Sequence, residues 1–195
     1  MADLTPLLQS SGAILSGHFL LASGRHSAVY FEKFRVLQRP DVLSALCTEI
    51  ATAFAACQID WVAGPTTGGI IIAFEVGRQM GLPTLYFESD GGARTLRRGQ
   101  NIQPGQRVLL VDDVLTTGSS LLQVVALIRE AGAIPVGVGI LIDRSQTPPP
   151  FDAPIFSAYR VEAESYAADA IPDWLQAIPL TVPGTRAQSQ SGPSA

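Results

Sequence analysis

The sequence predicts an α/β fold in which a parallel sheet is covered by helices on both faces. Strand-like runs alternate with amphipathic helical segments, the runs are apolar along their whole length, and glycine- or proline-rich turns separate them. The chain has 195 residues, of which 47% are hydrophobic and 15% charged, so it can build one domain with a substantial core.

The amino-terminal part is glycine-rich, and its expected elements are short. Apolar spacing indicates a helix over residues 3–10, after which glycines break the periodicity around a loop at 19–21. Alternating apolar and polar residues predict a strand over 29–34. Pro40 then begins an amphipathic helix that runs to about Ala56, because apolar residues recur there at steps of three and four.

From residue 61 onward, strands and helices alternate regularly. We expect strands over 61–63, 84–87, 107–111, 134–141 and 155–161, with helices over 70–80 and 119–131. Gly81 and Gly132 end the two helices. The segments between and after these elements are expected to be a long polar loop over 88–106, a stiff proline-rich connector over 145–154 and a disordered tail from Thr181.

Composition and charge exclude several classes of protein. A net charge of −4 argues against general affinity for nucleic acid, and the apolar runs are too short to span a bilayer. The first residues lack the basic end and apolar stretch of a signal peptide, so we expect a cytoplasmic protein with no membrane or nucleic-acid partner. His18 and His26 lack the spacing of a zinc site.

Residues 108–120 carry the clearest chemical signal, because an apolar strand leads into Asp112, Asp113 and then a turn rich in hydroxyls that opens a helix. Backbone N–H groups in such a turn, together with the positive end of the helix, bind anions, and Gly118 lets a phosphate approach closely. The two carboxylates suit the vicinal hydroxyls of a ribose and can hold Mg²⁺ through water. The segment therefore predicts a site for a phosphorylated sugar and a metal.

Taken singly, the same residues have a plainer interpretation. The hydroxyls could simply cap the helix, and the acids could lie in water at a strand end. Their combination in this order favours the phosphorylated sugar. Neither GxxxxGK[ST] nor GxGxxG occurs here, which disfavours nucleoside triphosphate and dinucleotide sites. Arg94, Arg97, Arg98 and Arg107 form a local basic patch that could bind a small anion.

Residues 108–120 closely resemble the phosphoribosyl diphosphate signature of the type I phosphoribosyltransferases. Residues 17–27 and the following Glu32-Lys33 look like the amino-terminal region of the orotate phosphoribosyltransferases in that family. Residues 64–69 resemble their diphosphate-binding turn, and Arg144 falls where these enzymes keep an arginine that holds the orotate carboxylate.

The resemblance implies a Rossmann-like core, with a small N-terminal hood made of about residues 1–38 and the C-terminal part of the chain. One phosphoribosyltransferase domain would then occupy residues 1–180, followed by the tail over 181–195. The implied activity is transfer of ribose 5-phosphate from 5-phosphoribosyl 1-diphosphate to orotate, giving orotidine 5′-monophosphate and diphosphate in the biosynthesis of UMP. The resemblance also implies a Mg²⁺ requirement and a homodimer whose hood loop reaches the neighbouring active site.

Site residues follow from the same resemblance. The residues expected to bind phosphoribosyl diphosphate are Asp112, Asp113, Val114, Leu115, Thr116, Thr117, Gly118, Ser119, Ser120, Thr67, Gly68, Arg94 and Arg98. Those expected to bind orotate are Thr116, Arg144 and Lys33. Asp112, Asp113 and Arg94 are the candidate catalytic residues, with the two aspartates holding the metal through water rather than as direct ligands.

The loop over residues 88–99 departs from the family pattern, because it has neither lysine nor histidine. We hypothesise that Arg94, with help from Arg97 or Arg98, replaces the missing cations, the alternative being ordinary surface arginines. A loop without lysine or histidine would also suit a regulatory module that binds phosphoribosyl diphosphate without turnover. No helix-turn-helix pattern supports that class. A third alternative is transfer to another base, but purines offer no carboxylate for Arg144 to bind.

Overall fold

The computed structural model of the protein describes residues 3–21, 23–145, 147, 149–161 and 164–183. The chain divides into two compact units. The larger comprises Met1–Leu4 and Val36–Val161, and the smaller comprises Thr5–Arg35 and Glu162–Ala195. Helix α2 (Lys33–Leu37) spans the point where the chain passes from the smaller unit to the larger.

A six-stranded sheet with the order β5-β4-β3-β6-β7-β8 forms the centre of the larger unit. Its strands are β3 (Trp61–Pro65), β4 (Thr84–Asp90), β5 (Ala93–Thr95), β6 (Arg107–Leu115), β7 (Ile134–Asp143) and β8 (Ile155–Arg160). All neighbouring strands are parallel except β4 and β5, which form an antiparallel hairpin. The predicted α/β fold with a parallel sheet and flanking helices is confirmed.

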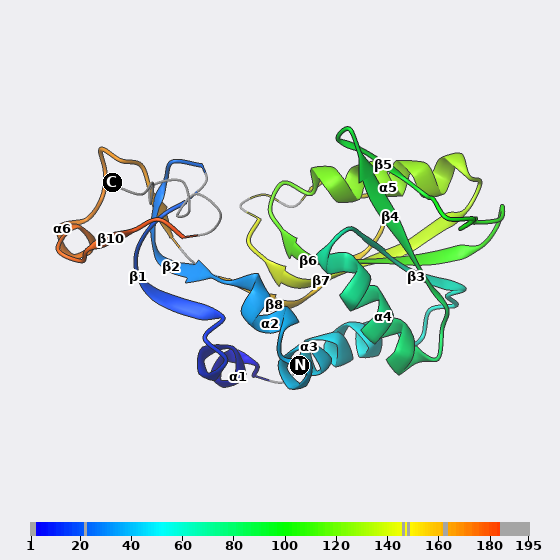
Figure 1. The fold of residues 1–195 in the computed structure, drawn as a ribbon, viewed down its shortest axis with the longest axis horizontal. Coiled ribbons are helices and arrows are strands. Elements are labelled where there is room, and N and C mark those ends of the chain that lie inside the picture. Colours follow the sequence, from blue (N-terminus) through cyan, green and yellow to red (C-terminus); the bar gives the residue numbers. More distant parts are fainter. Residues whose placement is uncertain (1–2, 22, 146, 148, 162–163, 184–195) are drawn as a thin grey trace, which may run out of the picture. The chain divides into compact units, whose positions relative to one another are not determined.

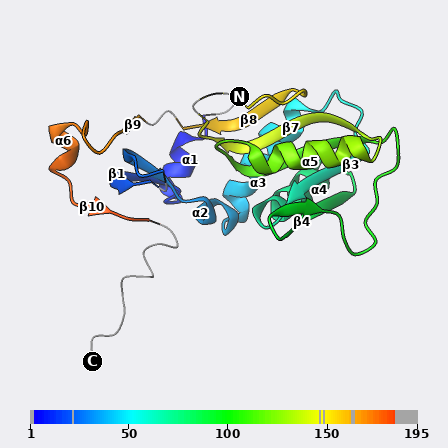
Figure 2. The ribbon, with the colours of Figure 1, turned by 90° about the horizontal axis from the view of Figure 1, so that it is seen from above.

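Helices cover both faces of this sheet: α5 (Ser119–Glu130) lies on one side, and α3 (Pro40–Ala53) and α4 (Gly68–Met80) lie on the other (Figures 1 and 2). Val138 and Ile140 of β7 belong to the same buried cluster as the apolar residues of α5. Gly139, between them, points the other way, because a Cβ there would lie 2.5 Å from the Ile50 side chain of α3. The absence of a side chain at this position lets α3 pack close to the sheet.

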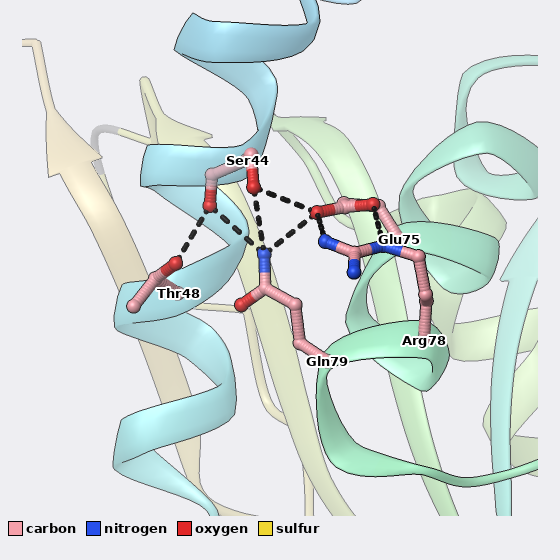
Figure 3. Close-up of polar contacts among 5 residues, drawn as sticks. All are labelled: Ser44, Thr48, Glu75, Arg78 and Gln79. Carbon is pink, nitrogen blue, oxygen red and sulfur yellow. Dashed lines mark hydrogen bonds and ion pairs between the residues drawn. The ribbon is translucent and has the colours of Figure 1, made fainter.

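A polar network joins α3 to α4 (Figure 3). The Glu75 carboxylate accepts hydrogen bonds from the Ser44 hydroxyl, the Arg78 guanidinium and the Gln79 amide, each at 2.8 Å. The Gln79 amide also donates to the Ser44 carbonyl at 3.0 Å. The Arg78 hydrogen bonds, followed by those of Gln79 and Ser44, lower the pKa of Glu75 from 4.5 to about 2.

We expect Glu75→Gln to lower the free energy of unfolding at neutral pH by about 1–2 kcal/mol, because it removes a charged acceptor from several donors. Since the pKa is lowered in the folded state, the stabilisation by Glu75 is present above pH 4.5 and is lost as the pH falls toward 2. Urea unfolding at several pH values measures both effects. Asp41→Asn, which breaks an exposed pair with Arg39, is the control and should change stability by under about 0.5 kcal/mol.

The smaller unit brings together both ends of the chain. Its sheet has the order β10-β1-β2-β9, and Figure 1 shows the blue amino-terminal strands beside the orange and red carboxyl-terminal ones. The elements are α1 (Thr5–Ser10), β1 (Ile14–Leu20), β2 (His26–Phe31), β9 (Ser165–Tyr166), α6 (Asp173–Gln176) and β10 (Leu180–Thr181). Thr181 therefore lies in a strand, and residues 184–195 of the predicted tail lie outside the described residues.

His18 and His26 are buried in this smaller sheet, with 2.7 Å between His18 Nε2 and His26 Nδ1. His18 Nδ1 also lies 3.2 Å from the carbonyl oxygen of Ile178, so the pair links β1 to the carboxyl-terminal segment.

Within the described residues, no helix is long and apolar enough to cross a membrane.

Several sequence-based element predictions were wrong. Most of the predicted loop at 19–21 belongs to β1. The register of β1 against β2 shifts between Ser16 and Phe19, and the Phe19 ring packs over Gly17. Gly17 therefore provides space for an aromatic ring and does not end the strand. The predicted loop over 88–106 contains the end of β4 and all of β5. Lys33 begins α2 and does not end a strand.

Candidate active site

The carboxyl ends of parallel strands meet at one edge of the larger sheet. Pro65 at the end of β3 pairs with Phe87 of β4, and Leu115 at the end of β6 pairs with Asp143 of β7. The segments that follow these strands therefore start from the same edge. They are the turn after β3, the β4–β5 hairpin, the turn after β6 and Arg144 after β7.

Asp112 and Asp113 lie within β6, which continues to Leu115 because it pairs with β7 beyond the predicted end at residue 111. Asp113 is 8% exposed, and its carboxylate lies against the start of α4, where a Cβ on Gly68 would be 2.2 Å from Oδ2. Asp112 starts from the opposite face of the strand and is more exposed. Its Oδ1 accepts a hydrogen bond from the Asp113 backbone N–H at 2.8 Å.

The turn after β6 has the backbone that an anion site requires. Gly118 has φ +72°, a conformation that favours glycine, and a Cβ there would lie 2.8 Å from the Pro149 ring. Ser119 and Ser120 form the first turn of α5, where backbone N–H groups have no acceptor within the helix. The Thr117 hydroxyl donates to Ser119 Oγ at 3.3 Å. Hydroxyls and amides thus gather at the positive end of the helix.

Arg94 connects this turn to the one after β3. Its Nη1 donates to the carbonyl oxygen and the hydroxyl of Thr66, both at 3.2 Å, and its Nη2 donates to the Ser120 hydroxyl at 3.3 Å. Thr67 and Gly68 in the first turn were predicted from the sequence as phosphate-binding residues, whereas no role was predicted for Thr66. The signal was present, because Thr66 lies in the same segment as those two, but only the tertiary structure shows its contact.

The other predicted cations occupy different positions. Arg98 forms an ion pair with Glu88, with 2.8 Å between Nε and Oε1, so its guanidinium is directed at the base of the β4–β5 hairpin. Arg144 is half-buried, and its backbone N–H donates to the Leu115 carbonyl at 2.9 Å, which fixes it at the carboxyl end of β7. Lys33 belongs to the smaller unit, where its Nζ lies 5.6 Å from the centre of the Phe34 ring.

A pocket of about 590 Å³ borders this edge along β8. Leu115 and Asp143 line it where it approaches the candidate site. Asp143 Oδ1 accepts hydrogen bonds from the backbone N–H and hydroxyl of Ser145 at 2.8 and 2.6 Å, and its Oδ2 lies 3.7 Å from an Arg160 nitrogen. Asp143 therefore links the end of β7 to Ser145 and to Arg160 at the end of β8, a role that was not predicted from the sequence.

The donor set at Asp112 and Asp113 fits a magnesium ion that keeps most of its own water. In the part of the chain that the structure describes, no group of three or more His, Cys, Asp or Glu side chains could enclose a metal. Mg²⁺ sites that hold phosphates commonly use only one or two carboxylates, together with water and the phosphate oxygens. One carboxylate at this strand end is enough to meet that requirement, since Asp112 and Asp113 start from opposite faces of β6.

The family model for the phosphoribosyl transferase domain matches residues 42–168. Orotate phosphoribosyltransferase of Pelotomaculum thermopropionicum is 44% identical over 184 residues, covering 94% of this chain and 97% of the relative. The enzyme of the same name from Chlorobium phaeobacteroides strain DSM 266 is 41% identical, covering 94% of this chain and 95% of the relative.

Solved structures agree with this assignment. The crystal structure of orotate phosphoribosyltransferase from Aeropyrum pernix has a TM-score of 0.67 and 27% identity, and the match covers 82% of this chain and 94% of that one. Orotate phosphoribosyltransferase from Mycobacterium tuberculosis H37Rv, in complex with inorganic phosphate, has a TM-score of 0.65 at 24% identity, covering 81% and 94%, and supports the fold alone. By domain match, sequence identity and fold, the chain belongs to the orotate phosphoribosyltransferases of the phosphoribosyl transferase domain family.

Proposed function

We propose that this protein transfers ribose 5-phosphate from 5-phosphoribosyl 1-diphosphate to orotate, giving orotidine 5′-monophosphate and diphosphate, a step of UMP biosynthesis. The observation that carries the proposal is the gathering of Asp112, Asp113, the turn after β6 and Arg144 at one edge of the sheet. The close relatives that bear the name orotate phosphoribosyltransferase support the same reaction.

The activated sugar would bind along this edge. Its 5-phosphate would accept hydrogen bonds from residues 116–120, where the hydroxyls and amides of the α5 amino terminus gather. The carboxylates of Asp112 and Asp113 would accept hydrogen bonds from the ribose hydroxyls. Their neighbours Val114 and Leu115 end the same strand and would line the sugar site. The diphosphate would lie on the turn at Thr67 and Gly68, next to Arg94, with Arg98 at the base of the hairpin.

Breaking the bond to diphosphate builds positive charge on the ribose and negative charge on the leaving group. The carboxylates of Asp112 and Asp113 stabilise the first, and the Arg94 guanidinium stabilises the second. Magnesium, when bound, neutralises negative charge on the diphosphate oxygens and would be held through water by the two aspartates.

The base would be positioned mainly by Arg144. A guanidinium binds a carboxylate through two parallel hydrogen bonds, so it can fix the orotate ring and bring its nitrogen toward the anomeric carbon. Thr116, which follows the end of β6, would contact the same base. Lys33 is a further proposed contact of the base.

We assign the smaller unit as the hood of the enzyme, since it combines residues 5–35 with the carboxyl-terminal part of the chain. A homodimer and a cytoplasmic setting are further expectations that the family suggests. Size-exclusion chromatography with light scattering measures the oligomeric state, and a single-chain mass would contradict the dimer.

The proposed reaction is tested by incubating the protein with phosphoribosyl diphosphate, orotate and Mg²⁺ while following orotate absorbance. We expect orotate to be consumed, and chelation of the metal to stop the reaction. Adenine, hypoxanthine and uracil in parallel reactions test the other bases. Binding of phosphoribosyl diphosphate in calorimetry without turnover of any base would instead support the regulatory module.

A further inference from the structure

The turn from β3 into α4, defined here as residues 64–69 and called the diphosphate turn, is closely packed through its glycines. A Cβ on Gly64 would lie 2.1 Å from the Gly69 carbonyl oxygen, and a Cβ on Gly69 would lie 2.7 Å from the Pro65 ring. Neither glycine leaves room for a side chain, so the two ends of the turn are in direct contact. The turn therefore has little freedom to adjust when a neighbouring group moves.

Gly68 makes room for a group from another segment of the chain. Its φ angle lies outside the left-handed region, so the backbone alone would accept any residue at this position. A Cβ there would lie 2.2 Å from Asp113 Oδ2 and 2.9 Å from Asp113 Cγ. Space for a carboxylate, and not backbone freedom, is what glycine provides at position 68.

The Asp113 carboxylate is buried against the amino terminus of α4. The residue is 8% exposed and belongs to β6, which lies next to β3 in the sheet. Thr67, the N-cap residue of α4, makes no capping hydrogen bond with its side chain. The first turn of a helix has backbone N–H groups without an acceptor inside the helix, and its positive end stabilises a negative charge. The charge of Asp113 therefore favours the same position that the missing side chain of Gly68 leaves open.

We infer that Gly68 is a positioning residue, whose missing side chain lets Asp113 lie against α4 and so fixes the diphosphate turn relative to the sugar-binding acids. This inference rests on the proposed function. In phosphoribosyl diphosphate the diphosphate is attached to C1, next to the hydroxyl on C2, so the turn and the acids would bind neighbouring atoms of one ligand. Because a carboxylate has two oxygens, Asp113 can contact Gly68 and a ribose hydroxyl at the same time.

The first test adds one methyl group. We expect Gly68→Ala to lower kcat/KM for phosphoribosyl diphosphate by about 100-fold, the loss typical of displacing a binding group by about 1 Å. The KM for orotate should stay within about twofold, because Arg144 is assigned to the base and does not depend on this contact. Alanine forms helices more readily than glycine, so helix propensity would act in the opposite direction. Steady-state kinetics with each substrate varied in turn measures the difference.

Gly77→Ala is the matched control in the same helix. A Cβ on Gly77 would lie 2.3 Å from the Thr84 methyl group, so this position is as crowded as Gly68 but lies toward the carboxyl end of α4. The control should lower the thermal midpoint and leave kcat/KM for phosphoribosyl diphosphate unchanged. Equal kinetic losses in the two variants would show that crowding of α4, and not displacement of Asp113, reduces activity, which contradicts the inference.

The second test removes the group that Gly68 accommodates. In Asp113→Ala, the nearest remaining atom of residue 113 is its Cβ, 3.3 Å from a Cβ on residue 68. Adding Gly68→Ala to Asp113→Ala should therefore lower kcat/KM by no more than about threefold further, whereas independent effects would multiply. Calorimetry with phosphoribosyl diphosphate and Mg²⁺ gives the same comparison where turnover is too slow to measure. A full additional 100-fold loss would refute the inference.

The double variant also covers the case in which Gly68→Ala alone does not fold. Removing the carboxylate opens the space that the added methyl group needs, so Gly68→Ala/Asp113→Ala should then regain a cooperative thermal transition. If the double variant also fails to fold, Asp113 is not the group that Gly68 accommodates, and the inference is wrong.

Binding separates this inference from the proposed function. Wild-type affinity and turnover in Gly68→Ala would overturn the inference alone. If the wild-type protein binds phosphoribosyl diphosphate but forms no orotidine monophosphate, the proposed function is wrong, and the calorimetric comparison still tests Gly68. Absence of binding by the wild-type protein would contradict both.

Discussion

The double variant Asp112→Asn/Asp113→Asn should lower kcat/KM for phosphoribosyl diphosphate by about a thousand-fold, because each lost charged hydrogen bond is worth about 1.5–3 kcal/mol. Asparagine keeps the size of each side chain, so the loss reports on charge. Asp113 lies against Gly68 in a space that asparagine can still occupy. Steady-state kinetics and calorimetry with phosphoribosyl diphosphate and Mg²⁺ measure the effect.

Single variants separate the two carboxylates. Asp112 is the more exposed, so Asp112→Asn should lower turnover while leaving the thermal midpoint nearly unchanged. Asp113 is buried, so Asp113→Asn should change both turnover and the midpoint. Asp152→Asn, which alters an exposed side chain near the far end of α5, is the control and should leave both unchanged. Wild-type affinity of the double variant would contradict the assignment of the sugar site.

Arg144→Ala should lower kcat/KM for orotate by about 100- to 1000-fold, since losing one partner of a desolvated charge pair costs about 2–5 kcal/mol. Affinity for phosphoribosyl diphosphate should stay within about twofold, because Arg144 is assigned to the base alone. The backbone contact of Arg144 with Leu115 does not depend on the side chain, so the end of β7 should remain in place. Steady-state kinetics with each substrate varied in turn measures this separation.

Uracil provides the chemical control for Arg144, because it lacks the carboxylate of orotate. Any slow reaction of the wild-type protein with uracil should be the same in Arg144→Ala, whereas the preference for orotate should largely disappear. Arg129→Ala is the matched protein control, since Arg129 lies in the last turn of α5, at the opposite end from the site, and pairs with the exposed Asp152. Equal losses with orotate and uracil would show that Arg144 supports the structure and does not recognise the carboxylate.

The larger unit was predictable because its strands are buried on both faces and its helices alternate with them. Trp61–Pro65 and Arg107–Leu115 are apolar along most of their length, which is the local pattern of a parallel sheet. The smaller unit was not predictable in this way. Its β9 and β10 have only two residues each and exist because they pair with distant strands. No local pattern in a two-residue strand indicates such a partner.

The same distinction applies to the site. Residues 108–120 could be interpreted from sequence because strand, acids and turn are contiguous. The contact of Arg94 with Thr66 and Ser120 joins three segments that are far apart in the chain, so it emerges only from the fold. For Arg98, the local sequence suggested one partner and the fold provides another. The basic patch suggested a phosphate ligand, and the structure pairs Arg98 with Glu88.

The parallel pairing of β1 with β10 has a consequence for how the protein is made. Leu180 pairs with His18, so β1 gains this partner only after the whole of the larger unit has been synthesised. The larger unit contains no residue after Val161, so its sheet can form while the rest of the chain is being translated. Until residues 165–181 have been synthesised, β1 lacks its partner β10 and β2 lacks its partner β9. Folding of the nascent chain should therefore begin with the larger unit, and the sheet of the smaller unit should be completed last.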